Sequence, residues 1–438
     1  MSSFKIAIVA FFLVFGIVAV MIFAGIIPIG SSTGPSTATG NVVMWGTVKQ
    51  SSISKLLDDF ARNNKAFTLT YVEKTDADLD QSLIEALASG KGPDMIFLPD
   101  NLIIKHRDKI YPIPYTSIPQ GTFQSTFIDE ASLYLTDQGI LALPITIDPM
   151  VMYYNKSMFN EAGISLPPRT WDDVVSLVPK LTQKDNASNI NVAGIPFGSY
   201  NNVNHAKDLM AMLMLQSGNP IISQKNGGYI SNISDSSIGN TQASMNFYSQ
   251  FSNPLNNLYS WNASLPNSRD AFTSSQLAIY FGYASELFGI RAQNPNLDFD
   301  VAKMPQLTGT NKSLTFGRMY GIALLKSSKN LTTAYTATTI LAGADFSGNL
   351  ANTLSLPSPR RDLLAVKAIS SYGPVFNNSA LISESWLDPD RGASNAVFRD
   401  IIDGINRGDS LNTVLGNANN VLGQIVAQHS VAPQAPAQ

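Results

Sequence analysis

Strand-like and helix-like stretches alternate along the chain from Asn41 onward. The apolar run 42–45 is followed by a helical pattern over 51–63, a strand-like run over 67–72, a second helical pattern over 78–89 and a short apolar run over 94–98. A β-α-β-α-β order predicts a mostly parallel sheet covered by helices. Ligands of such sheets bind beyond the carboxyl ends of the strands, so the segments after Met44 and Leu98 are the first candidates for a binding site.

Length and composition indicate a globular protein of two domains. The chain has 438 residues, which exceeds the usual size of one domain. Its 29 Lys+Arg and 32 Asp+Glu give a net charge of −3, too weak a field to gather nucleic acid. The chain has 0 cysteines, so thiol catalysis, disulfides and cysteine-ligated metals are excluded. A lipidated N-terminal cysteine is excluded as a membrane tether for the same reason.

The N-terminus contains a long apolar segment. Residues 6–29 carry no charged side chain and follow Lys5. As a helix they would reach roughly 36 Å, enough to cross a hydrocarbon core of about 30 Å. We predict an uncleaved transmembrane anchor over 1–30 that spans the bilayer through 6–29, with Lys5 inside. A long signal sequence is the alternative, although Thr37–Thr39 is a poor cleavage site. The Ser/Thr/Gly-rich segment 31–40 would then be a flexible stalk.

The remaining sequence continues the mixture of strands and helices. Thr170, with Asp173 three residues later, predicts a helix start. Further patterns predict strands over 141–147, 276–283, 299–304 and 320–325, and helices over 205–216, 241–251, 331–342 and 395–427. Residues 431–438 contain no core-forming pattern and predict a disordered tail.

One block in the middle of the chain carries a specific resemblance. It contains Ala142–Asp148, Tyr153-Tyr154-Asn155-Lys156, Pro167-Pro168 and Thr170-Trp171-Asp172-Asp173. This block resembles extracellular solute-binding protein family 1, the maltodextrin-binding-like receptors of ABC importers. Weaker matches follow in the family's order: Gly92-Pro93-Asp94, Gln276–Ile279, Tyr320–Ala323 and Leu356-Pro357-Ser358. The sequence departs from the family in lacking the lipid-bearing cysteine and in having Ser275-Gln276 where the family has Gly-Lys.

The resemblance implies a two-lobed α/β fold of the periplasmic-binding-protein type II. Each lobe would be a mostly parallel sheet covered by helices, with the ligand in the cleft between the lobes. We assign 41–147 plus 303–356 to lobe 1 and 148–302 plus 357–430 to lobe 2, with crossings near Ile147, Ala302 and Pro357. The implied function is capture of a small polar solute, with a sugar or oligosaccharide favoured, by hinge closure. The implied partners are ABC permease subunits. The binding domain would lie on the extracytoplasmic side of the cell membrane as a monomer without cofactor.

Four aromatic residues are candidate walls for a sugar, because the C–H face of a pyranose packs on a flat ring. They are Trp45, Tyr283, Tyr320 and Trp386. Packing in a lobe core is the alternative for each. Other aromatic residues are better explained as core: Trp171 beside its helix cap, Trp261 before a loop, and Tyr280.

Polar residues near the expected cleft are candidate partners for sugar hydroxyls. They are Lys49, Gln50, Asp100, Asp148, Tyr200 and Asn201. The alternatives are a helix cap for Lys49 and Gln50, turn acids for the two aspartates, and a plain loop for Tyr200 and Asn201. Few basic residues stand among these positions, which favours an uncharged ligand.

Sequence motifs of catalysis and metal binding are missing. The three histidines stand in unrelated contexts, and no H-E-x-x-H, G-x-S-x-G, G-x-G-x-x-G or Walker A sequence occurs. Asp76-x-Asp78-x-Asp80 lacks the glycine and glutamate of an EF-hand, so these acids predict a turn and a helix start. We therefore expect no catalytic residue and no metal ligand. The alternatives are an extracellular carbohydrate-active hydrolase using Asp100 and Asp148, or a surface module that has kept the fold without transport.

Overall fold

The computed structural model describes residues 38–225, 228–310, 312–367 and 370–429. Residues from Gly40 onward form one compact unit. The predicted anchor, almost all of the predicted stalk and the predicted tail lie outside the described residues. In the part that the structure does describe, no helix is long and apolar enough to cross a membrane.

The first lobe begins with the predicted alternation. Its elements are β1 (Gly40–Gly46), α2 (Gln50–Asn63), β2 (Phe67–Glu73), α3 (Leu79–Ala88) and β3 (Met95–Pro99). In β1, Val42 and Met44 are buried while their neighbours are not, as the two-residue period of a strand requires. β1 pairs in parallel with β2 on one side and β3 on the other. The expected β-α-β-α-β unit is confirmed.

Short elements complete the first lobe before the chain crosses to the second. They are α4 (Ile103–His106), β4 (Ile110–Tyr111), α5 (Gln120–Thr126), β5 (Leu135–Thr136) and β6 (Gly139–Ile140). Short 3-10 turns at 100–102, 107–109 and 129–134 connect them.

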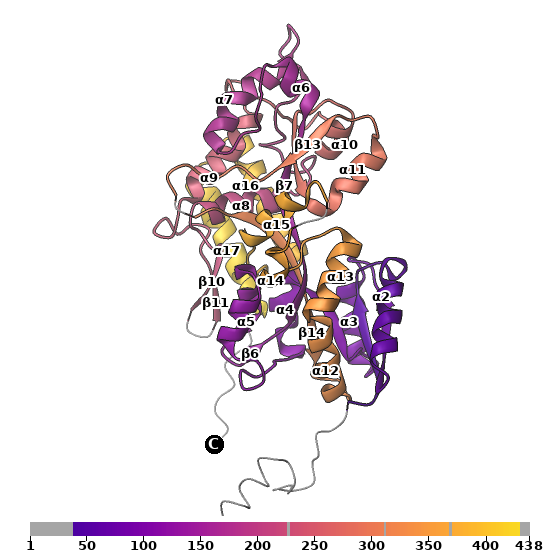
Figure 1. Cartoon of the computed structure of the whole chain (residues 1–438). Helices are drawn as coiled ribbons and strands as arrows, with labels where there is room; N and C mark the ends of the chain where they lie inside the picture. The colour runs from indigo at the N-terminus through magenta and orange to yellow at the C-terminus, as the bar shows by residue number, and fades with distance from the viewer. Residues whose placement is uncertain (1–37, 226–227, 311, 368–369, 430–438) are drawn as a thin grey trace, which may run out of the picture. The chain divides into compact units, whose positions relative to one another are not determined.

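Two long strands lie side by side in the main sheet. β7 (Leu143–Asn155) extends well beyond the predicted strand over 141–147, and β14 (Thr315–Leu325) returns beside it in the opposite direction. The first part of β7 pairs with β14, and its second part pairs with β12 and β13. β14 also pairs with β3, so it lies between β7 and the parallel strands. The chain therefore enters the second lobe along a continuous strand (Figure 1).

The second lobe is built mainly from helices around the far half of β7. Its helices are α6 (Lys156–Glu161), α7 (Trp171–Leu181), α8 (Ala206–Gln216), α9 (Thr241–Ser249), α10 (Ser268–Thr273) and α11 (Leu287–Gln293). Its strands are β8 (Gln183–Lys184), β9 (Ile190–Val192), β10 (Ile222–Lys225), β11 (Gly228–Ser231), β12 (Ile279–Tyr283) and β13 (Phe299–Ala302). Every residue of α8 is buried, which is typical of a helix at the centre of a lobe.

The C-terminal third contributes to both lobes. α12 (Leu331–Leu341) and α13 (Ala344–Leu354) pack on the first lobe. They are followed by α14 (Arg361–Leu364), α15 (Gly373–Leu381), β15 (Ser383–Glu384), α16 (Arg391–Arg407) and α17 (Leu411–His429). The helical tail predicted over 395–427 is divided in two, because Gly408 takes a left-handed conformation (φ 91°) that ends α16.

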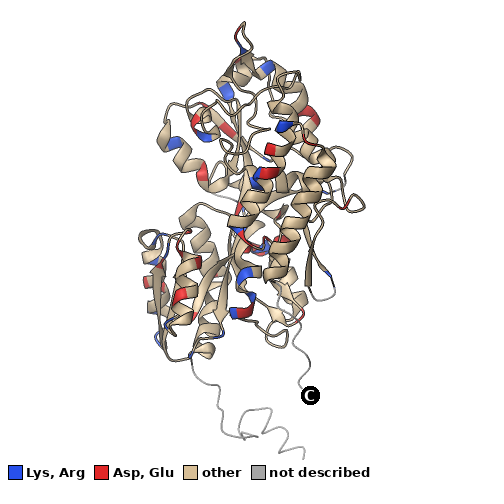
Figure 2. Ribbon diagram, turned by 180° about the vertical axis from the view of Figure 1, so that it is seen from behind, with Lys and Arg blue, Asp and Glu red and all other residues tan. Residues whose placement is uncertain are grey.

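Each lobe has its own apolar core. The second lobe contains a cluster of buried aromatic rings in which Phe197 contacts Trp171, Tyr248 and Phe281. Trp171, Trp261 and Tyr280 are buried here, as predicted. Acidic and basic residues are interspersed over the ribbon instead of forming one charged patch (Figure 2), in keeping with the low net charge.

The expectation of a separate, mostly parallel sheet in each lobe is wrong. Among the described residues, nine strands form one mixed sheet in which β7 and β14 make antiparallel pairs with strands of both lobes. Parallel pairing is confined to β1–β2, β1–β3 and β14–β15. The reason is that β14 returns through the middle of the sheet, which the β-α-β pattern of the first 100 residues could not reveal. The residue boundaries of the two lobes stay a prediction.

Candidate functional site

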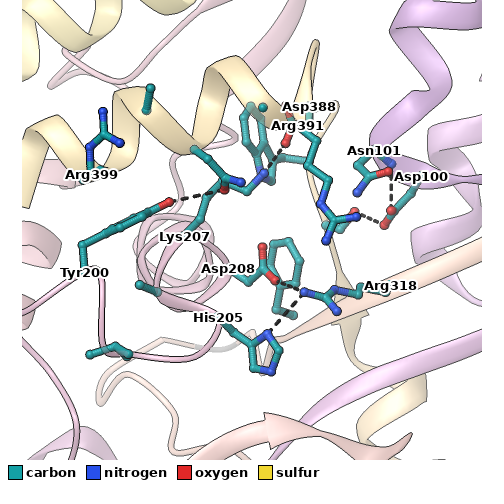
Figure 3. A pocket seen from close by; sticks show the side chains of 18 of the residues that line it. Asp100, Asn101, Tyr200, His205, Lys207, Asp208, Arg318, Asp388, Arg391 and Arg399 are labelled. Atoms are coloured by element: carbon teal, nitrogen blue, oxygen red, sulfur yellow. Dashed lines mark hydrogen bonds and ion pairs between the residues drawn. The ribbon is translucent and has the colours of Figure 1, made fainter. Parts of the chain in front are cut away.

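A polar cavity of about 420 Å³ is lined by segments from both lobes. The residues directly after β3 and the first half of β14 form one side, and the start of α8 with the segment leading into α16 forms the other (Figure 3). Its volume lies within the range of small-molecule sites, roughly 300 to 1,000 Å³. The lining residues used below are Asp100, Asn101, Tyr200, Asn201, His205, Lys207, Asp208, Phe316, Arg318, Ser385, Trp386, Asp388, Arg391, Asn395 and Arg399.

The first turn of α8 points at the cavity. His205 precedes the helix in a left-handed conformation (φ 60°), so the chain turns sharply into the helix. Lys207 and Asp208 then stand side by side in the first turn and line the cavity. The unpaired N–H groups of a helix start give this side of the cavity a partial positive charge.

The start of α16 forms the neighbouring wall. Asp390 caps the helix by accepting a hydrogen bond from the Ala393 backbone N–H at 3.0 Å. Arg391, Asn395 and Arg399 follow at four-residue spacing, which places them on one face of the helix. All three line the cavity.

Two ion pairs fix the charges at the base of the cavity. Arg318 from β14 donates to Asp208 Oδ2 at 2.7 Å, and its guanidinium lies 3.9 Å from the centre of the Tyr283 ring. Burial raises the pKa of Asp208, but the nearby charges, that of Arg318 foremost, outweigh burial and lower this pKa to about 2. Lys207 Nζ lies 2.5 Å from Asp388 Oδ2. The cation beside Asp208 therefore favours its ionised form.

Asp100 supplies a fixed carboxylate on the opposite side. Its Oδ2 accepts from Ser385 Oγ at 2.6 Å and from the Met319 backbone N–H at 3.3 Å. Burial raises the pKa of Asp100 to about 6, against the lowering effect of these hydrogen bonds. The group is anchored by its neighbours and titrates within the physiological range.

Four predicted site residues line the cavity: Asp100, Tyr200, Asn201 and Trp386. Tyr200 is half-buried and donates through its hydroxyl to Asn395 Oδ1 at 3.3 Å. Asn201 is exposed. Trp386 is only 3% exposed and packs on Phe398, so it contributes a small part of its ring to the wall.

Two further predicted residues lie behind the wall of the cavity. Tyr283 is fully buried and donates to Asp208 Oδ2 at 2.7 Å. This hydrogen bond helps to fix the position of Asp208, which lines the cavity. Asp148 in β7 accepts from the Ser285 backbone N–H at 3.0 Å. Burial raises the pKa of Asp148 to about 6. Neither side chain is part of the lining.

The other four predicted site residues lie outside the lining. Trp45 is half-buried at the end of β1, with Lys74 Nζ 4.2 Å from the centre of its ring. Lys49 and Gln50 are exposed at the start of α2, and the Gln50 backbone N–H donates to Glu73. Tyr320 is half-buried in β14. No bound solute tests any of the ten positions, which stay predictions.

The cations of the cavity were not foreseen. Lys207, Arg318, Arg391 and Arg399 all line it, so the expectation of few basic residues at the cleft is wrong. These residues come from the start of α8, from two positions along α16 and from the first half of β14, where the sequence carries no motif that marks a site. Only Arg318 could have been suspected from the sequence, because it stands two residues before Tyr320, which was predicted to contact the ligand.

The described residues contain no group of three or more His, Asp or Glu side chains arranged to hold a metal ion. Asp78 stands at the N-cap position of α3, as the helix-start interpretation of the Asp76–Asp80 acids predicts. The cavity offers charged groups, hydroxyls and amides, which suit reversible binding of a polar molecule.

Comparison with known proteins defines the class. The model of the bacterial extracellular solute-binding protein family matches residues 45–343. The chain therefore belongs to this family of binding proteins, whose name places its members outside the cell.

Individual relatives are distant. A multiple sugar-binding protein of Streptococcus mutans is 28% identical over 134 residues, which make up 30% of this chain and 31% of that protein. The match thus spans about a third of the length of this curated relative. A cyclo/maltodextrin-binding protein complexed with maltotetraose is similar in structure, with a TM-score of 0.72 and 15% identity over 93% of this chain and 100% of that chain. A cyclic α-maltosyl-1,6-maltose binding protein from Arthrobacter globiformis gives a TM-score of 0.73 and 13% identity over 89% and 99%. These likenesses establish the two-lobed solute-binding fold.

Proposed function

We propose that this protein is the extracytoplasmic receptor of an ABC importer and that it captures a small polar solute, a sugar or oligosaccharide, by closure of its two lobes. The observation that carries this proposal is the polar cavity of about 420 Å³ lined by both lobes. Asp100 and Arg318 stand on one side, and Tyr200, Lys207 and Asn395 on the other. A ligand that contacts both sides favours the closed form, because it binds that form better than the open one. The names of the sugar-binding relatives support the same ligand class.

The binding test is a panel of sugars, polyols and amino acids followed by titration calorimetry and tryptophan fluorescence. We expect at least one sugar to bind and to change the fluorescence, since Trp386 lies in the cavity wall. Silence across the whole panel would contradict the proposal and favour a surface module without transport. After long incubation the sugar should be recovered uncut; cleavage would instead favour the hydrolase alternative, with Asp100 and Asp148 as its acids.

A matched pair of variants connects binding to this cavity. Asn201 lines the cavity, whereas Asn160 lies on α6 away from the lining; both are exposed. Asn201→Ala should weaken binding about three- to tenfold through the loss of a hydrogen bond to the ligand. Asn160→Ala should leave the affinity unchanged. Equal affinity for both variants would place the ligand elsewhere.

The mode of anchoring and the lobe boundaries are part of the proposal. Residues 6–29 would hold the protein in the membrane, the segment 31–40 would act as a stalk, and 41–147 plus 303–356 would close against 148–302 plus 357–430. The absence of any cysteine supports an anchor that is not a lipid. Deletion of residues 1–40 should release a soluble receptor that still binds. If the truncated protein stays with the membrane fraction, the anchor lies elsewhere.

A further inference from the structure

The charged groups of the cavity are not all neutralised within the protein. Lys207 is paired with Asp388, and Arg318 with Asp208. Arg399 contacts Asp400 at 3.3 Å. Among the described residues, the guanidinium of Arg391 has neither an ion pair nor a side-chain hydrogen bond to the protein, although it lines the same cavity.

Arg391 is placed to meet a ligand. It is the first residue of α16 and is exposed. Its side chain reaches from the helix into the cavity, toward the side on which Asp100 and Arg318 lie (Figure 3). Arg399 lies two turns further along the same face. A planar guanidinium without a partner can form two parallel hydrogen bonds with a carboxylate.

The charge balance of the lining points the same way. Lys207, Arg318 and Arg399 each have a carboxylate partner, respectively Asp388, Asp208 and Asp400. Among the described residues, Arg391 is the cation of the lining that has none. The first turns of α8 and α16 both border the cavity and add partial positive charge. The site therefore matches a ligand with one negative charge.

The aromatic surface of the cavity is small by comparison. Trp386 and Phe316 are 3% and 5% exposed, so little of either ring is available for stacking. Tyr200 offers more surface, being half-buried. A neutral pyranose depends on open ring faces for much of its affinity, and here the charged groups are the more accessible part of the lining.

We propose that the solute is a sugar acid whose single carboxylate binds Arg391, while its hydroxyls bind Asp100, Tyr200 and Asn395. This inference rests on the proposed function and specifies the ligand class. A phosphate group carries about 1.5 to 2 negative charges near pH 7, more than the single uncompensated charge of the lining. A carboxylate fits that balance.

The experiment compares matched ligands on the full-length chain by titration calorimetry. The probes are D-galacturonate and D-glucuronate with their 1,4-linked oligomers, the corresponding neutral sugars, and the 6-phosphates of galactose and glucose. We expect at least one acid to bind at least tenfold more tightly than its neutral counterpart, with the preference reduced at high salt. Arg391→Gln should remove this preference. Arg407→Gln, a change at an exposed arginine on the same helix that pairs with Asp409, should keep it.

Several outcomes would overturn the inference. Tight binding of a neutral sugar without an acid preference refutes it and leaves the proposed function standing. Preference for a sugar phosphate refutes the carboxylate assignment. An unchanged acid preference in Arg391→Gln refutes the role of Arg391; because this residue is exposed, the variant should fold, and thermal unfolding checks that it does. Failure of every sugar to bind removes the proposed function together with the inference.

Discussion

Glu130 is a buried carboxyl group for which the described residues provide no ion pair. It is 2% exposed, and neither carboxyl oxygen has a hydrogen-bond partner among the described residues. It packs against Gly317, where an added Cβ would lie 2.1 Å from Glu130 Oε2. Burial first, and then the charge of Asp100, raise the pKa of Glu130 well above its ordinary value. The neutral form is therefore the one that the folded protein accommodates.

This arrangement predicts that Glu130→Gln stabilises the protein at alkaline pH. Below about pH 4.3, the ordinary pKa of a glutamate in the unfolded chain, Glu130 is protonated in both states and does not lower the free energy of unfolding. As pH rises from there to the raised pKa of Glu130 in the folded protein, the unfolded chain gives up the proton more readily, so the free energy of unfolding falls. In the wild type the loss approaches 1.4 kcal/mol per pH unit within that window. The variant should show no such loss, so its advantage in thermal unfolding should be larger at pH 8 than at pH 5. Exposed Glu161→Gln is the control; equal curves for all three proteins would contradict the assignment.

Asp100 predicts a pH dependence of ligand binding. Its pKa is raised to about 6 by burial, and it lines the cavity as an acceptor for ligand hydroxyls. As pH falls below about 6, Asp100 becomes protonated and loses acceptor capacity, so the affinity should fall. Asp100→Asn should bind more weakly at pH 7.5, with less change between pH 7.5 and 5. A variant that keeps the full pH dependence would assign it to another group.

At the scale of elements, local patterns predicted most helices and strands. α2, β2, α3, α8 and α12 lie within one or two residues of their expected bounds, and α7 begins at the expected cap. These elements carry local signals, such as a cap, a period or a flanking turn. The sequence did not reveal that the predicted strand over 141–147 continues to Asn155 as the single strand β7, or that β14 lies between β7 and β3. Strand pairing depends on contacts between distant segments, and local periodicity contains no information about them.

The start of α7 gives a prediction for one element. Thr170 Oγ1 accepts from the Asp173 N–H at 3.1 Å, and Asp173 Oδ2 accepts from the Thr170 N–H at 3.0 Å, which is the capping box expected from the sequence. Thr170→Ala removes one of these bonds and should lower the free energy of unfolding by about 1 kcal/mol. Thr170→Ser retains the hydroxyl and should unfold close to wild type. Chemical denaturation measures both; an unaffected alanine variant would show that packing alone holds the helix start.

At the scale of the whole molecule, the site was predictable only in part. Asp100, Tyr200, Asn201 and Trp386 could be found because they follow strands or stand in a region known from relatives. The cations could not, since Arg318 meets Asp208 across 110 residues of sequence, and Lys207 meets Asp388 across 181. Each charge is unremarkable where it stands in the sequence. These charges form a site only because the fold brings β14 and α16 to the same cavity.

Several contacts near the cavity join residues of the two predicted lobes, among them the Arg318–Asp208 ion pair described above. Lys105 on α4 contacts Asp390 at the start of α16 at 2.8 Å, while also holding Asp80 at 2.7 Å. Arg107 donates to the Tyr229 hydroxyl at 2.9 Å, and Ser385 donates to Asp100 at 2.6 Å. If the proposed closure takes place, we expect such contacts to favour the closed form and so to reduce the binding energy that the ligand must supply for closure.

Breaking the Lys105–Asp390 contact should therefore weaken ligand binding without touching the ligand. Asp390→Asn suits this test, because asparagine caps a helix about as well as aspartate and the cap to Ala393 is retained. A partly exposed ion pair contributes up to about 1 kcal/mol, so we expect the affinity to fall two- to fivefold. Small-angle scattering should show a larger radius of gyration than wild type without ligand and the same radius at saturation. Asp403→Asn, further along α16, should change neither quantity. If Asp390→Asn also changes neither, the Lys105–Asp390 contact plays no part in closure.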